Sequence, residues 1–412
     1  MKITPDFAPP LSIVAPFFVV AAFFYTACTF SLFLLDPTIG YNDFAAAGWV
    51  HLFLLGFVMS VILGAAAQLI PVALEQGHRF VGVFIPILYI FTIGTLVLVS
   101  GFWFFPEVLH YGGALVGGAL FLYLIDVFAT LFAAKRTTLT TAAIRMAHIF
   151  LAGAVTVGIF ATLYFVLGIE INFFAVFVSH IAFGVGGYMF LVVIGVAVIL
   201  LPMFGLAHGF SQKPAEYSVW SLSLGVSLVF ISSFSGFYSG VAFGFALIVV
   251  ATFLFIYQVF LINKKRVRKE ADVWYVSLAV SFVSLGLSVI FSIFASVFLG
   301  EKFIKVAAFL FGMGFLFFLI TGHLYKIIPF LVWFERFSPL VGKQKVPMLH
   351  QMAPKKAAWY QLCFGIAGVF LSSLGLLTQN REIWFGGVSF LSIGSLFLLG
   401  AVFWMIRFKG AK

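Results

Sequence analysis

Long apolar stretches alternate with short polar ones along the whole chain. About twelve of these stretches stay apolar for roughly 20 residues or more, the length that an α-helix needs to cross about 30 Å of hydrocarbon. They lie at residues 12–35, 46–72, 81–103, 110–134, 143–168, 172–203, 217–238, 240–262, 273–299, 304–334, 358–378 and 383–407. We therefore predict an all-α, polytopic membrane protein of about 12 transmembrane helices, in which residues 1–412 form a single transmembrane domain.

The composition agrees with this pattern. Hydrophobic residues make up 63% of the chain and charged residues 9%, whereas charged residues make up about 25% of an ordinary globular domain. No polar segment is long enough to form a separate soluble domain. The first apolar run continues to Leu35, longer than the core of a secretory signal, so we expect it to remain as a membrane span.

The net charge of +10 is distributed unevenly between the loops. Basic residues gather after the even-numbered spans, as in "LINKKRVRKEAD" after span 8, whereas six acids lie in the opposite loops. This is the asymmetry of the positive-inside rule. It predicts a multi-pass protein of the cell inner membrane with both termini in the cytoplasm, and it argues against nucleic acid as the partner of the basic charge.

Three spans share a motif in which a glycine precedes a proline by seven residues. The copies are "GAAAQLIP", "GVAVILLP" and "GHLYKIIP", ending at Pro71, Pro202 and Pro329. The prolines are 131 and 127 residues apart, and each interval holds four spans. We therefore predict three pseudo-symmetric four-helix units, at about 12–134, 143–262 and 273–407. The proline is expected to end or kink its helix, and the glycine to let a neighbouring helix approach closely.

Two of the three motif spans also carry a histidine near their outer end. His51 lies 20 residues before its proline and His180 lies 22 residues before its own, so the two rings are expected at similar depth. Neutral imidazole is a common ligand of copper, zinc and iron, so the pair is a candidate metal or heme site. The alternative is that each ring hydrogen-bonds a backbone carbonyl and only helps the helices to pack.

The predicted architecture resembles the catalytic subunit, subunit I, of the heme-copper oxidases, and the related nitric-oxide-response heme-copper membrane proteins. In sequence the resemblance rests on the motif helices that contain His51 and His180. In the oxidases, helix 2 carries an outer-side histidine that ligates the low-spin heme, and helix 6 carries a histidine that ligates copper. The resemblance thus implies heme or copper as cofactor, with His51 and His180 as the cofactor and metal ligands. It also implies other respiratory or assembly membrane subunits as partners, besides the lipid bilayer.

The chain departs from the oxidase pattern where the remaining ligands would be. The oxidases carry two histidines on helix 10 and an adjacent histidine pair on helix 7. Here the corresponding stretches read "KVAAFLFGMGFLF" and "YSVWSLSLGVSLVFISSFSGFY". Oxygen reduction needs a ligand set for each metal centre. We therefore predict a divergent, non-oxidase member of the fold, with a role in respiratory, metal or stress physiology, and we assign it no enzymatic reaction.

A second group of polar residues lies in the inner halves of the spans. Its members are candidates for a proton or ion path: Asp126, His148, His323, Gln68 and Lys326. Asp126 is expected to pair with His148 or Arg145, because a short loop joins their helices. In the alternative interpretation the basic side chains extend to the headgroups and Asp126 is neutralised by one partner. His78 falls in a loop and is expected to be solvated.

These observations leave three classes of function open. The first is an oxidase-like scaffold that binds heme or copper at its outer histidines. The second is a membrane transporter or channel that uses the inner Asp/His cluster. The third is a non-catalytic scaffold that docks a partner subunit through its basic loops, although these loops are also expected simply to set topology and contact anionic lipid.

Overall fold

A computed structural model describes residues 9–134, 137–168 and 170–410, and all regular structure within these ranges is helical. Twelve helices of the described residues are long and apolar enough to cross a membrane. They coincide with the twelve spans expected from the sequence, with ends that differ by at most four residues. The predicted all-α class and number of spans are therefore confirmed.

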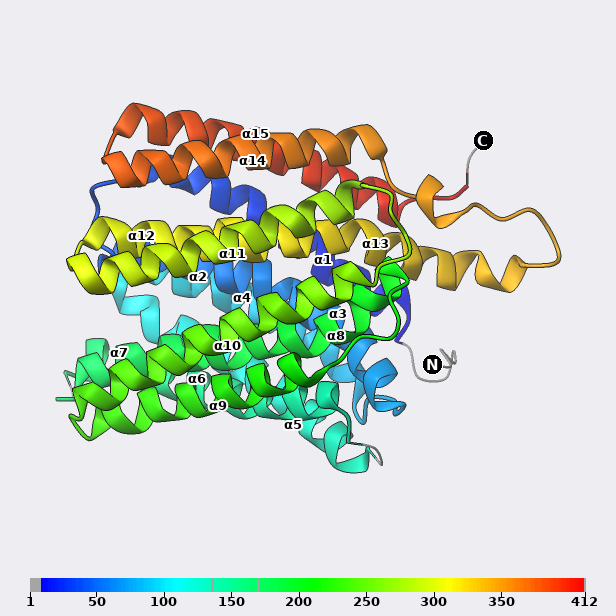
Figure 1. Cartoon of the computed structure of the whole chain (residues 1–412). Coiled ribbons are helices and arrows are strands. Elements are labelled where there is room, and N and C mark those ends of the chain that lie inside the picture. The colour runs from blue at the N-terminus through cyan, green and yellow to red at the C-terminus, as the bar shows by residue number, and fades with distance from the viewer. Residues whose placement is uncertain (1–8, 135–136, 169, 411–412) are drawn as a thin grey trace. The chain divides into compact units, whose positions relative to one another are not determined.

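Contacts between residues divide the chain into two compact units, of which unit 1 comprises 67–98 and 107–269. Its helices are the end of α3 (Ser60–Leu74), η3 (Val81–Val83), most of α4 (Phe84–Trp103), η4 (Pro106–Val108), α5 (Leu109–Ala133), α6 (Leu139–Leu167), α7 (Phe173–Ile181), η5 (Ala182–Phe190), α8 (Leu191–Gly205), α9 (Lys213–Phe234) and α10 (Tyr238–Lys264). Helix α6 packs against α5, α7, η5 and α8, and α9 lies along α10 as a hairpin (Figure 1).

Unit 2 comprises residues 9–66, 99–106 and 270–412. Its helices are α1 (Leu11–Ser31), η1 (Leu32–Leu34), α2 (Phe44–His51), η2 (Leu52–Met59), the start of α3, α11 (Val273–Phe298), α12 (Glu301–Phe309), η6 (Leu310–Leu316), α13 (Phe317–Arg336), η7 (Ser338–Leu340), η8 (Leu349–Gln351), α14 (Lys355–Thr378) and α15 (Arg381–Ile406). Helices α14 and α15 form a hairpin, and α15 also packs against α1 and α13.

The three spans that carry the glycine–proline motif, here called the motif helices, are the longest of the described chain. They run over Phe44–Leu74, Phe173–Gly205 and Glu301–Arg336, with 31, 33 and 36 residues. In their most apolar stretch 61, 61 and 67% of residues are buried, against 33–56% in the other spans. Each contains one π-helical segment, η2, η5 or η6. Such segments are rare and occur often at functional sites.

The motif prolines lie inside their helices. Helix α3 continues past Pro71 to Leu74, α8 continues past Pro202 to Gly205, and α13 continues past Pro329 to Arg336. Of the two expected effects, an end of the helix at the proline is therefore wrong, and a kink stays a prediction. A membrane helix tolerates the missing N–H because neighbouring groups can satisfy the freed carbonyl.

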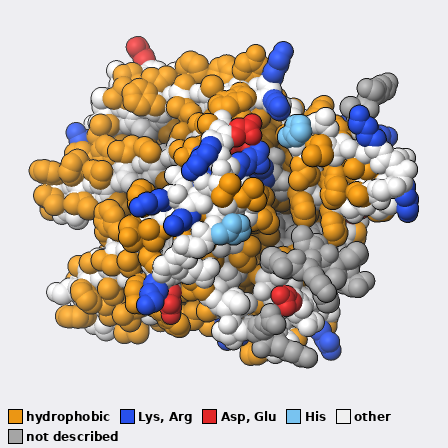
Figure 2. Space-filling model, turned by 45° about the vertical axis from the view of Figure 1, so that its right-hand side comes forward, with side chains coloured by type: hydrophobic (Ala, Val, Ile, Leu, Met, Phe, Trp, Pro, Cys, Tyr) orange, Lys and Arg blue, Asp and Glu red, His pale blue; other side chains and the backbone are white. Residues whose placement is uncertain are grey.

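In unit 2 the start of α1 and the residues that follow α15 both lie beside the end of α13. The backbone N–H of Leu11 donates to Glu335 at 2.5 Å, and the next residue, Arg336, donates to the Phe408 carbonyl at 2.9 Å. Figure 2 shows Lys and Arg side chains gathered on the face that carries the polar loops, whereas hydrophobic side chains cover the flanks. We call the end of each unit that carries the Lys- and Arg-rich loops its basic end.

Candidate functional site

Each motif glycine lies against the span that precedes it in the chain. A Cβ on Gly64 would lie 2.8 Å from Phe17 Cβ, one on Gly195 2.9 Å from Ala143 Cβ, and one on Gly322 2.8 Å from Ser277 Cβ. Real Cβ atoms do not approach so closely, so a side chain at these positions would push the helices apart. The expected close approach at the motif glycine is confirmed in all three copies.

A second glycine, eight residues before the first, repeats the same arrangement. A Cβ built on this second glycine would lie 2.6–2.7 Å from the nearest side-chain atom of the preceding span. The contacts are Gly56 with Phe24, Gly187 with Phe150, and Gly314 with Ser284. On the preceding span the two contacting residues are seven apart in every copy. The repeated motif is therefore Gly-x7-Gly-x6-Pro, and all three glycine pairs are visible in the sequence.

His51 is the last residue of α2 in unit 2. Its Nδ1 lies 2.8 Å from the Ala47 carbonyl, and its ring stacks on Phe102 at 4.9 Å between centroids. Because a carbonyl can only accept, Nδ1 carries the proton and Nε2 carries the lone pair of the neutral ring. The ring is thus oriented as a ligand histidine would be.

Trp49 and Phe53 point away from His51 and toward the third motif helix. Trp49 stacks on Phe53 at 5.7 Å and on Phe309 at 6.4 Å, and Phe53 lies 3.2 Å from a Cβ built on Gly312. Two residues along a helix correspond to about 200° of rotation, so His51 lies on the opposite face from this contact. A heme held between helix 2 and helix 10, as the resemblance implies, therefore does not fit these residues.

Stacked aromatic rings fill the interior of unit 2 at this level. We call this set the aromatic core: Tyr25, Trp49, Phe53, Phe57, Phe309 and Phe317. Tyr25 stacks on Phe317 at 4.6 Å with an angle of 13° between the rings, and lies 4.9 Å from Phe57. These three side chains are at most 1% exposed. Their close packing leaves this region apolar and dense.

His180 lies near the end of α7 in unit 1. Its Nδ1 lies 3.0 Å from the Ala154 carbonyl of α6, and a Cβ on Gly158 would lie 2.8 Å from its ring. The ring therefore rests on α6 with the proton on Nδ1, like His51. His51 belongs to unit 2 and His180 to unit 1, so neither unit by itself contains both histidines.

The inner acid, Asp126, pairs with His78 rather than with His148 or Arg145. Asp126 Oδ2 lies 2.5 Å from His78 Nδ1, and the two side chains are 0% and 1% exposed. The expectations that Asp126 would pair across α5 and α6, and that His78 would be solvated, are therefore wrong. The loop after α3 folds back so that the Phe80 N–H donates to Asp126 Oδ1 at 2.7 Å.

Further backbone bonds hold this pair in place. His78 Nε2 donates to the Ala67 carbonyl at 3.1 Å, beside Gln68 on α3. The Arg79 N–H donates to the Thr130 hydroxyl, and that hydroxyl donates to the Asp126 carbonyl. The local sequence does not predict this contact, because His78 and Asp126 are 48 positions apart.

His148 lies between two tyrosines in the middle of unit 1. Its Nδ1 donates to the Ile144 carbonyl at 2.6 Å, and its Nε2 accepts from the Tyr123 hydroxyl at 2.9 Å. The Tyr188 ring, on η5, lies edge-on to it at 5.5 Å. All three side chains are at most 1% exposed. The sequence predicted His148 as a site residue but gave no sign that Tyr123 would be its hydrogen-bond partner.

His323 and Lys326 form a separate cluster in unit 2. His323 Nε2 accepts from Trp274 Nε1 at 3.3 Å, and its Nδ1 donates to the Leu319 carbonyl. Lys326 Nζ lies 2.6 Å from Asp272 Oδ2. The five residues predicted as one inner path therefore fall into both units: Gln68, Asp126 and His148 in unit 1, His323 and Lys326 in unit 2.

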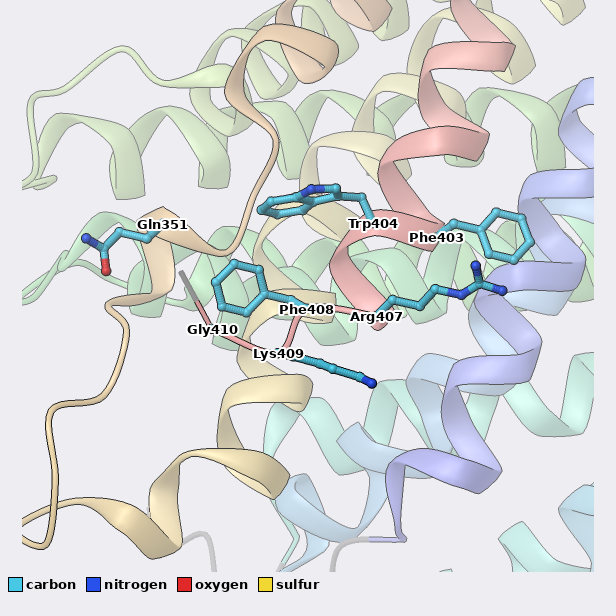
Figure 3. A pocket seen from close by; sticks show the side chains of 7 residues that line it. All are labelled: Gln351, Phe403, Trp404, Arg407, Phe408, Lys409 and Gly410. Carbon is cyan, nitrogen blue, oxygen red and sulfur yellow. The ribbon is translucent and has the colours of Figure 1, made fainter. Parts of the chain in front are cut away.

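A cleft of about 520 Å³ opens beside the end of α15 in unit 2. Figure 3 shows the Trp404 and Phe408 rings close together, with Arg407 and Lys409 extending to the side opposite Trp404 and Gln351. The two rings are 5.2 Å apart. Because the polar groups do not converge on one point, we assign this cleft no ligand.

The donor sets bear on which metal centres the residues could hold. Over the described ranges, no group of three or more His, Cys, Asp or Glu side chains could hold a metal ion. An oxidase-type copper centre with several histidines therefore does not fit. A single imidazole, His51 or His180, does have the proton position and orientation of a ligand.

Comparison with solved structures agrees with the fold. The chain is similar to a heme-copper terminal oxidase solved as a dimer by cryo-EM, with a TM-score of 0.64, over 98% of this chain and 84% of that one. The chain has an oxidase subunit I-like fold. The sequence identity is only 13%, so the likeness shows the fold and not the chemistry. No family model and no curated protein matches the sequence.

Proposed function

We propose that unit 1 carries protons across the membrane, and that its buried polar residues form the half of the route between the basic end and the middle of the membrane. The proposed route, called the polar line, is formed by His78, Asp126, Tyr123, His148 and Tyr188. The observation that carries the proposal is the buried pair of His78 and Asp126, 2.5 Å apart. Ionisable groups within spans are costly, and chained acids and histidines mark proton routes.

The hydrogen bonds of the pair define how many protons it holds. His78 Nε2 must carry a proton because it faces the Ala67 carbonyl. One further proton lies between Nδ1 and Asp126 Oδ2, so the pair is either imidazolium with carboxylate or imidazole with carboxylic acid. Both forms are neutral overall. The shared proton can therefore move between Nδ1 and Oδ2 without a change in the charge of the pair.

The rest of the polar line continues toward the middle of unit 1. Tyr123 lies one turn from Asp126 on α5, and already donates to His148. When the protonated Asp126 gives its proton to the Tyr123 oxygen, the carboxyl O–H bond breaks and a new Tyr123 O–H bond forms. The original Tyr123 proton moves to His148 Nε2, which leaves an Asp126 carboxylate and a His148 imidazolium. Tyr188 lies 15 residues from the start of its span and 17 from the end, close to mid-membrane.

Proton uptake by vesicles tests the proposal. The purified protein would be placed in liposomes that contain a pH-sensitive dye, and an inward pH gradient and a potential would be applied. We expect acidification that is faster than in empty vesicles, and its loss in Asp126→Asn. The matched control is Asp272→Asn, which removes the acid of the separate cluster in unit 2. Equal rates in wild type and Asp126→Asn would contradict the proposal.

Heme or copper binding through His51 and His180 is the second candidate function. It is supported by the Nδ1 proton of each ring, which a backbone carbonyl fixes so that Nε2 bears the lone pair. A heme bound there would supply a redox centre, and the protein's part would be to orient the imidazole. An absorption spectrum with metal analysis, compared with the His51→Ala, His180→Ala double variant, tests this. A colourless and metal-free wild type, made with heme and copper available, would rule it out.

Two further points of the architecture belong to the proposal. We take the chain as three related four-helix repeats, at about 12–134, 143–262 and 273–407, which are distinct from the two compact units described above. The repeated glycine contacts and π-helical segments support this division. We also take the basic ends as cytoplasmic, in an inner membrane, which the charge asymmetry supports. In that orientation the polar line would take protons from the cytoplasm.

A further inference from the structure

Three of the buried polar side chains in unit 2 that have unpaired polar atoms lie on neighbouring helices. They are the Ser277 hydroxyl on α11, the Tyr325 hydroxyl on α13 and the Gln361 amide on α14, 0, 6 and 0% exposed. None of these atoms hydrogen-bonds to another group in the described part of the chain. In the same ranges, Gln361 is the one buried amide whose oxygen and nitrogen are both unpaired.

The helices that carry these side chains meet at one place. Gly322 of α13 touches Ser277 of α11, with 2.8 Å between a built Cβ and Ser277 Cβ. A Cβ on Gly365 of α14 would lie 3.1 Å from the ring of Phe318 on α13. Helices α11 and α14 also contact one another. The three helices therefore form a junction on one face of α13.

Helix geometry directs the three polar groups into this junction. Phe318, Gly322 and Tyr325 share a face of α13, because they are spaced at four and three residues. Side chains on a helix lean toward its N-terminus, so the Tyr325 ring leans back toward the level of Gly322. Gln361 lies one turn from Gly365 on α14. The hydroxyls of Ser277 and Tyr325 and the Gln361 amide thus lie at a similar level of this junction.

We infer that these three side chains bind ordered water between α11, α13 and α14. Buried polar groups in native proteins are nearly always hydrogen-bonded, and an amide left unpaired costs free energy. Buried water makes about three hydrogen bonds and is found where polar groups converge. The amide can both donate and accept, and each hydroxyl can do the same, so together they offer water a complete set of partners.

The aromatic core would close this water site on its far side. Phe317 and Phe318 follow the junction along α13 away from the basic end, and both are at most 1% exposed. Water bound at Ser277, Tyr325 and Gln361 would therefore be confined to the basic half of unit 2, because the aromatic rings block the way beyond. The inference is independent of the proton route proposed for unit 1, because it uses none of the same residues.

Radiolytic footprinting of the purified wild-type protein tests the inference, because hydroxyl radicals formed from bound water label adjacent buried side chains. Tyr25 is the internal control, since it is buried in the aromatic core of the same unit. We expect Tyr325 to be oxidised several-fold faster than Tyr25. We also expect Gln361→Met, which keeps the length of the side chain and removes the amide, to slow labelling of Tyr325 toward the rate of Tyr25.

Labelling of wild-type Tyr325 that is as slow as that of Tyr25 would overturn the inference, and this comparison needs no variant to fold. If Tyr325 is labelled fast but equally fast in Gln361→Met, the amide does not belong to the site and the inference as stated is wrong. If Gln361→Met does not fold, Gln361→Asn, which shortens the amide by one methylene, takes its place, with the same expected slowing.

Discussion

The first and second motif helices place different side chains at equivalent positions. Phe57 lies 14 residues before Pro71 in unit 2, and Tyr188 lies 14 residues before Pro202 in unit 1. Phe57 packs against Tyr25 in the aromatic core, whereas Tyr188 packs against His148 at the end of the polar line. Both helices contact the preceding span through a pair of glycines at equivalent positions. The shared backbone packing thus supports an apolar interior in one place and a polar one in the other.

The glycines set the spacing of the helices, and the residues between them set the chemistry of the interior. Spacing is a property of the backbone and tolerates no side chain at the glycines. The interior between the helices can then hold stacked rings or a line of hydroxyl, imidazole and carboxyl groups. We expect the function to lie in the polar interior of unit 1, because polar groups within a membrane span are costly and are kept where they are needed.

Removing the Asp126 carboxyl group of the polar line should cause one of the two largest losses of unfolding free energy. Asp126→Ala leaves His78 and the Phe80 N–H buried without their partner. Breaking a buried ion pair in this way costs about 3–5 kcal/mol of unfolding free energy. Denaturant titration in detergent would measure it, with Asp126→Asn, which keeps hydrogen bonding, expected to lose less. A loss below about 1 kcal/mol would mean that the pair is not held as described.

A truncation in the aromatic core should be equally costly for a different reason. Phe317→Ala removes the ring that stacks on Tyr25 and leaves a cavity, which costs about 3–5 kcal/mol. The proton uptake expected of unit 1 should persist in any fraction that remains folded. Comparing stability and uptake in Phe317→Ala and Asp126→Asn therefore separates the two interiors. Loss of uptake in folded Phe317→Ala would contradict the separation.

Exchanging the two matched residues should have a smaller and asymmetric effect. Phe57→Tyr places a hydroxyl in the dense aromatic core, where an unpaired polar group costs about 1–3 kcal/mol. Tyr188→Phe keeps the ring that packs edge-on against His148 and removes only the hydroxyl, so its stability should change by less than about 1 kcal/mol. Thermal unfolding in one detergent compares both variants. Equal losses would show that the two interiors are not different in polarity.

The smallest expected effect lies outside the spans, in the loop that follows η1. Hydrogen bonds from the Thr38 hydroxyl and N–H hold the pKa of the Asp36 carboxyl below its ordinary value, and Arg381 adds to this. A lowered pKa stabilises the folded state above the unfolded pKa, and this gain is lost as the pH falls through the folded pKa. Asp36→Asn should therefore lower stability by a few tenths of a kcal/mol at pH 7 and not in acid. Unfolding at both pH values measures this difference, and a loss of the same size in acid would contradict it.

The twelve spans could be predicted well because each is a long apolar stretch, and recognising such a stretch needs no information on residues far away in the sequence. The sequence also predicted the contacts of Gly64, Gly195 and Gly322, because a close approach depends on one residue type. The pairing of Asp126 could not be predicted. It depends on a loop that returns to bring His78 against a helix 48 residues later, and the sequence marks that loop only as polar.

The candidate cofactor site could be predicted only in part. His51 and His180 were chosen by depth, and both rings do have the proton on Nδ1. Depth does not fix the direction in which a side chain points. The contacts of Trp49 and Phe53 with the third motif helix decided that His51 lies on the other face. Helical phase was the missing information.

The most direct test of the account is whether Asp126 changes its protonation. Infrared difference spectra of the protein in lipid would be recorded between neutral and acidic pH, in wild type and in Asp126→Asn. If the pair of His78 and Asp126 carries protons, a carboxylic acid C=O band appears on acidification in wild type and is absent in Asp126→Asn. If wild type and variant give the same spectrum, Asp126 keeps one protonation state over this pH range, and the proposed proton route through unit 1 is wrong.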